Sequence, residues 1–178
     1  MSLSIGDPAP AFNLPGADGA DHALKTAAAA PATVVVFTCN HCPYALAWED
    51  RLLAAGRDYA DRGVRFFAIN PNDDTIKPAD SFDAMKRRVA EHPWPFPYLR
   101  DESQEVAHAY GALTTPDVFV FGGDGRLAYR GAPDADYEEP ALKAAWLRGA
   151  LDALLAGDDP DPAETKPVGC SVKWRRTD

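Results

Sequence analysis

The sequence predicts an α/β fold with a central mixed β-sheet flanked by helices, and three segments carry this prediction. An apolar, β-branched run at 34–37 is typical of a strand that is buried on both faces. An amphipathic stretch from 43 to about 61 and a second apolar run at 64–70 follow it, which predicts a parallel β-α-β unit. Further along, two apolar runs flank the glycine-rich turn 122–125 and predict an antiparallel hairpin.

The remaining elements of the first half are shorter. Turn signals frame two apolar pieces at 12–14 and 23–24, which predicts a small β-hairpin before the core. From Ser81 to about Glu91, apolar side chains recur at helical spacing and predict a second helix. Ser81 is the expected N-cap, and Asp80 competes for that position.

In the second half, prolines and aromatic residues alternate over 92–97, and this pattern predicts an exposed connection. A short strand at 98–101 and a short helix at 103–113 are expected next. After the antiparallel hairpin, the last helix is predicted from Pro140 to Ala156.

We expect one domain over residues 1–157, and a linker and tail over residues 158–178. A chain of 178 residues is long enough to bury a full α/β core. The segment 158–162 is rich in Asp and Pro, as is typical of a linker.

The charge of the chain excludes two classes of partner. A net charge of −9 disfavours nucleic acid and anionic membrane surfaces, because both require a clustered basic face. The basic segment 173–176 is too short to change this conclusion, and no stretch approaches the length of a membrane span. We therefore expect neither a nucleic-acid partner nor a membrane partner.

The N-terminal segment and the cysteines indicate a reducing compartment. Residues 1–8 lack the basic segment and the apolar run of a signal peptide, so we expect a cytoplasmic protein. In that compartment, three cysteines of which two are closely spaced are more typical of redox chemistry or metal binding than of structural disulfides.

Cys39 and Cys42 form a C-x-x-C motif where the first core strand ends and a helix begins. Free N–H groups and the positive end of the helix dipole favour a thiolate there. We expect Cys39 to be the more exposed thiol and the one nearer the helix end. Its pKa should fall to roughly 3.5–7.5. His41, as a donor or a cation, would stabilise the thiolate further, and Pro43 suits the first helical turn.

The order of these elements resembles the thioredoxin fold, and more narrowly the peroxiredoxin-like, AhpC/TSA-type branch of it. Gly6–Phe12 is similar to the usual opening of that branch, and Pro95–Asp101 is similar to its pre-helix segment. The resemblance covers about Ile5 to Ala156. It implies that Thr115 and Pro116 form the cis-proline loop, which faces the dithiol and pairs with the backbone of a substrate.

The chain departs from active peroxiredoxins at two positions. Their peroxide-reactive cysteine matches Cys42, but their helper threonine is replaced by Cys39 and their helper arginine by Pro116. Nothing in the motif is then arranged to polarise a peroxide O–O bond. The expected chemistry is therefore thiol–disulfide exchange.

In this exchange, Cys39 attacks a substrate disulfide and Cys42 resolves the mixed disulfide. The partners expected are a protein or small-molecule disulfide and a reductant such as a thioredoxin-type donor, with no cofactor. One alternative is a thiol peroxidase with Cys42 as the peroxidatic and Cys39 as the resolving cysteine.

A second alternative is a metal-binding or redox-sensing module without turnover. Cys39, His41, Cys42 and Cys170 could supply four ligands, but such short spacing strains a tetrahedral site, so no metal site is predicted.

Cys170 is a candidate third thiol. Glycine and proline near it permit the tail to fold back, so Cys170 could relay oxidation from the dithiol. The alternative is a free surface thiol on a tail packed by Val172 and Trp174. The pattern Gly-Cys-Ser-x-Lys-Trp is similar to tails in the same branch, which favours a functional role.

Overall fold

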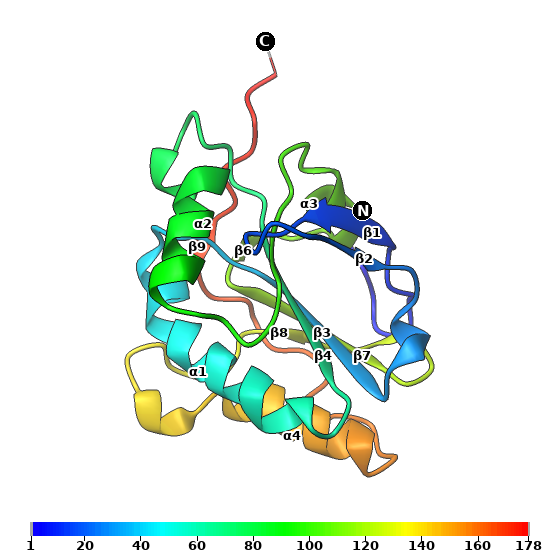
Figure 1. Ribbon diagram of the computed structural model, residues 1–178. Helices are drawn as coiled ribbons and strands as arrows, with labels where there is room; N and C mark the ends of the chain where they lie inside the picture. The colour runs from blue at the N-terminus through cyan, green and yellow to red at the C-terminus, as the bar shows by residue number, and fades with distance from the viewer. Residues whose placement is uncertain (1, 178) are drawn as a thin grey trace.

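A five-stranded mixed sheet forms the centre of the protein, described over residues 2–177 by a computed structural model (Figure 1). Strand β3 runs parallel to β4 and antiparallel to β7, and β5 is parallel to β4. This arrangement confirms the predicted mixed sheet. In spatial order, the strands are β5 (Tyr98–Arg100), β4 (Arg65–Asn70), β3 (Ala32–Phe37), β7 (Asp117–Gly122) and β8 (Leu127–Gly131).

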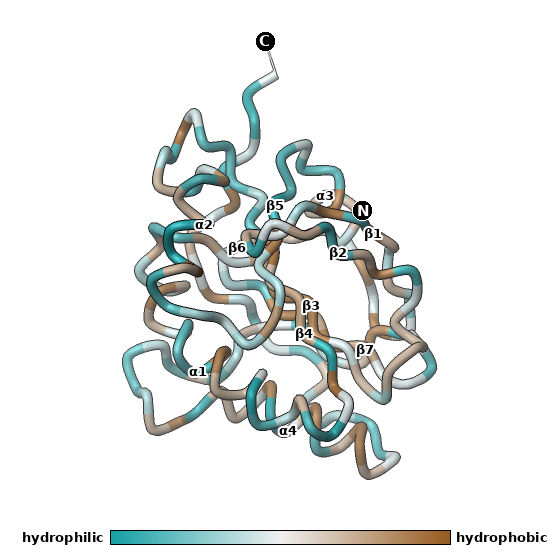
Figure 2. The backbone as a smooth tube through the Cα atoms, viewed as in Figure 1, coloured by the Kyte–Doolittle hydropathy of each residue, from teal (hydrophilic) through white to brown (hydrophobic). Residues whose placement is uncertain are grey.

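Both faces of the sheet are covered, and every residue of β3 is buried, the polar Thr33 included. The apolar residues 34–37 of this strand supply the core on both faces (Figure 2). Val34 and Val36 pack in one core cluster with residues of α1, α2 and α4, whereas Val35 and Phe37 pack in another with the N-terminal hairpin and α3. The elements concerned are α1 (Pro43–Ala60), α2 (Phe82–Glu91), α4 (Ala145–Leu155), β1 (Phe12–Pro15), β2 (Asp21–Leu24) and α3 (Glu105–Tyr110).

Residues 2–177 also contain three short 3-10 helices: η1 (Ala27–Ala29), η2 (Pro78–Asp80) and η3 (Pro140–Leu142). The single helix predicted from Pro140 to Ala156 is wrong at its start. Lys143 and Ala144 adopt left-handed φ values of 53° and 57°, which separates η3 from α4. Ser81 is confirmed as the N-cap of α2, because its side chain accepts from the N–H of Ala84.

The tail returns to the body of the protein. Strand β9 (Cys170–Ser171) pairs antiparallel with β6 (Thr114–Thr115), which precedes Pro116. Val172 is buried beyond this pairing. The predicted division into a domain and a linker with tail did not include this contact, and the division itself stays a prediction.

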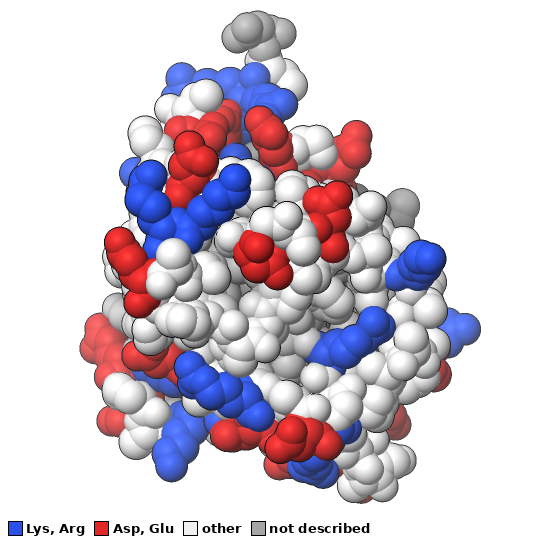
Figure 3. Space-filling model, in the orientation of Figure 1, with Lys and Arg blue, Asp and Glu red and all other residues white. Residues whose placement is uncertain are grey.

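The surface carries both signs of charge. On the face shown in Figure 3, acidic and basic side chains are interspersed, and Lys and Arg gather near the C-terminal end. Over residues 2–177, no helix combines the length and the hydropathy needed to cross a bilayer.

Candidate active site

The two motif cysteines lie at the junction between β3 and α1. Cys42 is the N-cap residue of α1, and Pro43 occupies the first helical position. The side chains of Cys39 and Cys42 are buried, with 1% and 0% of each residue exposed. The two thiols are thus equally buried, and the predicted difference in exposure is not decided by these values. The prediction that Cys39 is nearer the helix end is wrong, because the helix starts one residue after Cys42 and its first turn lies against that sulfur.

The loop that contains Pro116 faces both thiols. The Thr115–Pro116 peptide bond is cis, as predicted. Thr115 Oγ1 lies 3.2 Å from Cys39 Sγ, and the Thr115 carbonyl oxygen accepts a hydrogen bond from the Cys42 thiol at 3.3 Å. The structure thus brings together four of the predicted site residues, and their role in binding a substrate stays a prediction.

The two thiols differ in proton affinity. In its thiolate form, Cys42 accepts hydrogen bonds from the thiols of Cys39 and Cys170 and from the main-chain N–H groups of Ala45 and Cys170. These hydrogen bonds, that from Cys39 above all, outweigh burial and lower the pKa of Cys42 to about 4. The pKa of Cys39 is raised, first because its thiol donates a hydrogen bond to Cys42 and second because the thiol is buried. The predicted low pKa therefore belongs to Cys42, because the free N–H groups of the first turn reach the N-cap sulfur.

His41 contacts a carboxylate as well as the motif. Its Nδ1 donates to Asp80 Oδ2 at 2.5 Å, and its main-chain N–H donates to the sulfur of Cys39. The hydrogen bond from His41 to a sulfur is thus made by the backbone. The predicted effect of the imidazole on the thiolate stays a prediction.

Asp80 is the functional residue that sequence reasoning missed. It ends η2, is fully buried, and accepts hydrogen bonds at both carboxylate oxygens. Oδ1 accepts from the Asn40 main chain at 2.6 Å and from Asn70 Nδ2 at 3.2 Å, and Oδ2 accepts from His41 and from Asn72 Nδ2 at 3.0 Å. One carboxylate therefore fixes both residues between the cysteines. The sequence signal for this buried carboxylate is the pair of asparagines, Asn70 and Asn72, that follows an apolar run.

The structure also brings together three residues of types that ligate metals. Ligand atoms of Cys39, His41 and Asp80 lie within 4.8 Å of one another, a set that differs from the one considered from the sequence. Both Asp80 oxygens already accept two N–H groups each, and His41 Nδ1 supplies one of these. This arrangement is that of a satisfied hydrogen-bond network around a buried carboxylate.

Cys170 completes a cluster of three free thiols. It is partly exposed and packs against the group formed by Cys39, Cys42 and Ala45. Burial, followed in size by the influence of the neighbouring Cys42, raises the pKa of Cys170 to about 11. The candidate third thiol therefore lies beside the dithiol rather than on a free tail.

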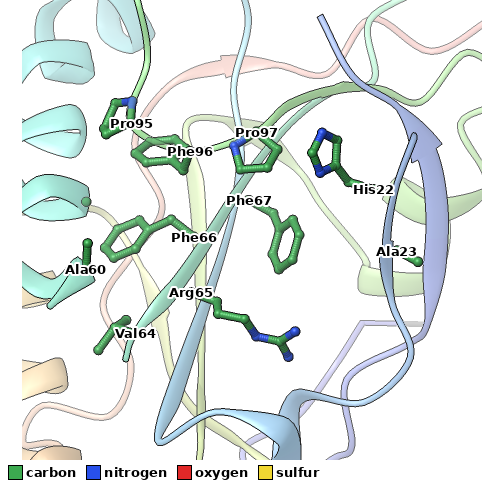
Figure 4. A pocket seen from close by; sticks show the side chains of 11 residues that line it. His22, Ala23, Ala60, Val64, Arg65, Phe66, Phe67, Pro95, Phe96 and Pro97 are labelled. Atoms are coloured by element: carbon green, nitrogen blue, oxygen red, sulfur yellow. The ribbon is translucent and has the colours of Figure 1, made fainter. Parts of the chain in front are cut away.

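A cavity of ≈ 360 Å³ lies elsewhere on the molecule (Figure 4). Phe66 and Phe96 stack in its lining at a centroid distance of 5.3 Å, and Arg65 lines another side. Arg65 pairs with Thr33 at the start of the parallel strands, whereas the dithiol follows their ends. The cavity therefore does not belong to the dithiol site.

Most of the chain matches a known protein family. The family model of the AhpC/TSA family matches residues 5–130. The chain belongs to the AhpC/TSA family. No relative was found among curated protein sequences.

Two solved structures are similar in fold to this AhpC/TSA protein over nearly its whole length. An uncharacterized conserved protein from Geobacillus kaustophilus is 39% identical, with a TM-score of 0.92 over 98% of this chain and 94% of its own. A hypothetical protein from Sinorhizobium meliloti 1021 is 35% identical, with a TM-score of 0.91 over 99% of this chain and 98% of its own.

A more distant structure bears on function. A Chlorobium tepidum protein described as a thiol:disulfide interchange protein DsbE is 25% identical, with a TM-score of 0.64 over 86% of this chain and 99% of its own. The fold of the AhpC/TSA protein is thus thioredoxin-like, and family and neighbours together support a thiol-based redox function.

Proposed function

We propose that the protein is a thiol–disulfide oxidoreductase that exchanges disulfides through Cys39 and Cys42. The observation that carries the proposal is the contact between the two thiols at the start of α1, opposite Thr115 and Pro116. The lowered pKa of Cys42 and the raised pKa of Cys39 favour a thiolate at Cys42 and a thiol at Cys39 at neutral pH. This is the state that a dithiol needs to attack a disulfide and then resolve the product.

The reaction runs in two steps. The Cys42 thiolate attacks a substrate disulfide, forms a mixed disulfide and releases one substrate thiolate. The thiol of Cys39 gives its proton to that thiolate and attacks the Cys42 sulfur, which closes the Cys39–Cys42 disulfide and releases the second half of the substrate as a thiolate that takes a proton from solvent. Two electrons pass to the substrate, and a dithiol donor of the thioredoxin type returns them. This order reverses the roles expected from the sequence, because the low pKa belongs to Cys42.

A thiol peroxidase is the second candidate, and the low pKa of Cys42 favours it, since peroxides react with thiolates. In that reaction, Cys42 becomes a sulfenic acid and Cys39 displaces water to form the same disulfide. The substitution of Cys39 and Pro116 for the two helper residues of peroxiredoxins counts against it. For either activity, we propose a cytoplasmic location, where reducing partners are present.

Parallel oxidations test the proposal. The reduced protein is mixed with equal concentrations of oxidised glutathione or hydrogen peroxide, quenched with acid, alkylated and mapped by peptide mass spectrometry. The Cys39–Cys42 disulfide should form faster with the disulfide than with the peroxide, and Cys42→Ser should abolish it with both. Faster formation with peroxide would replace the oxidoreductase by the peroxidase. A Cys42→Ser protein that still reacts at the wild-type rate would reject both assignments.

A further inference from the structure

The edge of β6 beside the dithiol is occupied by the chain's own tail. Thr115 is paired with Cys170 and Thr114 with Ser171, in antiparallel register. The pairing continues with the N–H of Val172, which donates to the Leu113 carbonyl at 3.1 Å. An extended segment bound at this edge is held by main-chain hydrogen bonds, as in β-strand addition.

Gly169 allows the backbone of the tail to approach the edge of β6 closely. A Cβ atom at this position would lie 2.2 Å from the carbonyl oxygen of Thr115 and 3.1 Å from the nitrogen of Pro116. Both are main-chain atoms, so they cannot rotate away as a flexible side chain would. The residue before Cys170 must therefore lack a side chain for β9 to reach β6.

Contacts beyond β9 fasten the tail. The main-chain N–H of Lys173 donates to Asn72 Oδ1 at 2.8 Å, and its carbonyl accepts from Gln104 Nε2 at 2.9 Å. Trp174 stacks on His108 with a centroid distance of 4.2 Å. The tail thus occupies a defined position, in which Cys170 is held against Cys42.

We propose that Cys170 is a third redox-active thiol that forms a disulfide with Cys42, and that β9 presents it there as a built-in substrate strand. The proposal rests on the proposed function, since it requires Cys42 to react with disulfides. It is supported by the strand register, by the fit of Gly169 and by the packing of Cys170 against the cluster of Cys39, Cys42 and Ala45.

The chemistry balances with a low-molecular-weight disulfide as the oxidant. Because Cys42 is fully buried, β9 first separates locally from β6. The Cys42 thiolate attacks the disulfide, and one small thiolate leaves. When β9 returns, Cys170 gives its proton to that thiolate, attacks the Cys42 sulfur and expels the second small thiolate, which takes a proton from solvent. Cys39 can then attack Cys42, which closes the Cys39–Cys42 disulfide and restores the thiol of Cys170.

Removal of Cys39 isolates the proposed step. Reduced Cys39→Ser protein, with Cys39→Ala as a second variant, is oxidised with oxidised glutathione and mapped beside the wild type. The Cys42–Cys170 disulfide should form in both variants and be lost in Cys39→Ser/Cys170→Ser, which should keep glutathione on Cys42.

If Cys39→Ser also keeps glutathione on Cys42, while the wild type forms the Cys39–Cys42 disulfide, the inference fails and the proposed function stands. A wild type that forms no Cys39–Cys42 disulfide contradicts the proposed function, whatever the variants do.

Gly169→Ala tests the docking without changing a thiol. The added Cβ should displace β9, so the alkylation rate of Cys42 in the reduced protein should rise about tenfold or more, which corresponds to ~1.4 kcal/mol of lost docking free energy. Gly149→Ala is the matched control, because its Cβ would meet no atom within 4 Å. Equal rates in Gly169→Ala, Gly149→Ala and wild type would overturn the proposed role of β9.

Discussion

His41 Nδ1 lies 2.5 Å from Asp80 Oδ2, and this hydrogen bond ties the C-x-x-C motif to a fully buried carboxylate at the end of η2. The main-chain N–H of Asn40 donates to the other oxygen of the same carboxylate. Both residues between the cysteines are therefore held by Asp80. Its negative charge also contributes to raising the pKa of Cys39.

Asp80→Asn should make Cys39 more reactive and the protein less stable. Loss of the negative charge should lower the pKa of Cys39, so its alkylation near pH 9 should be faster. An amide cannot accept all four hydrogen bonds, so the free energy of unfolding should fall by about 1–3 kcal/mol. Residue-resolved alkylation and urea titration measure the two effects. Asp58→Asn, at a carboxylate that is 59% exposed, is the control and should change neither.

The reduced protein should show a thiolate at acidic pH. The ultraviolet absorbance of the thiolate should titrate with a midpoint near pH 4, the pKa of Cys42. Cys42→Ser should remove this transition. Cys39→Ala should move it to higher pH, because the hydrogen bond from the Cys39 thiol is the largest cause of the low pKa. A wild-type midpoint near the ordinary thiol value of about 8.5 would contradict the assignment.

The same pKa predicts how stability depends on pH. The folded state lowers the pKa of Cys42 from 9.0 to about 4, so the thiolate stabilises the reduced protein fully above pH 9.0 and loses this effect as the pH falls to about 4. The excess in free energy of unfolding of wild type over Cys42→Ser should therefore be larger at about pH 8 than at about pH 5. Urea midpoints at the two pH values measure it, and an excess that is equal or smaller at the higher pH would refute the prediction.

The parts of the fold that the sequence predicts are those set by local patterns. The apolar run that becomes β3 and the proline that becomes the first residue of α1 mark the strand-to-helix junction without reference to any distant segment. The N-terminal hairpin and the cap at Ser81 follow from turn residues and capping chemistry in the same way. These predictions depend on neighbours within a few residues.

The rest of the site depends on contacts between segments far apart in the chain. Asp80 meets the motif across 39 residues, and Cys170 meets Thr115 through a pairing of two-residue strands that carries no hydrophobic pattern. Which cysteine is the thiolate depends on whether the helix begins before or after Cys42, a difference of a few residues that composition does not define. The residue types therefore predicted thiol chemistry at this site, but they did not predict which cysteine is the thiolate.

A buried ion pair between Arg51 of α1 and Asp134 should contribute strongly to stability. Asp134 accepts hydrogen bonds from Arg51 and from Trp48 Nε1, and the Arg51 and Asp134 side chains are only 5% and 1% exposed. Asp134→Ala leaves a buried guanidinium without its carboxylate and should cost about 3–5 kcal/mol in the free energy of unfolding. Asp58→Ala breaks the exposed pair with Arg148 and should cost less than about 1 kcal/mol. Urea titration of both variants measures the contrast, and similar costs would contradict it.

Trp174→Ala should loosen the tail without unfolding the domain. The stack of Trp174 on His108 is the aromatic contact that holds the tail beyond β9. Because an aromatic pair contributes about 0.5–1.5 kcal/mol beyond burial, its loss should raise local opening of the tail about two- to tenfold. Trypsin cleavage after Lys173 reports this opening, since the main-chain N–H and carbonyl of Lys173 are hydrogen-bonded when the tail is docked.

The control for this measurement is Trp94→Ala, which removes a stack of the same centroid distance, 4.2 Å, on Tyr98. It weakens the body of the protein and leaves the contacts of the tail in place, so trypsin cleavage after Lys173 should stay near the wild-type rate. If Trp94→Ala and Trp174→Ala accelerate cleavage equally, the tail opens only with global unfolding. In that case, Cys42 would also become accessible only by global unfolding, and Gly169→Ala would act through overall stability.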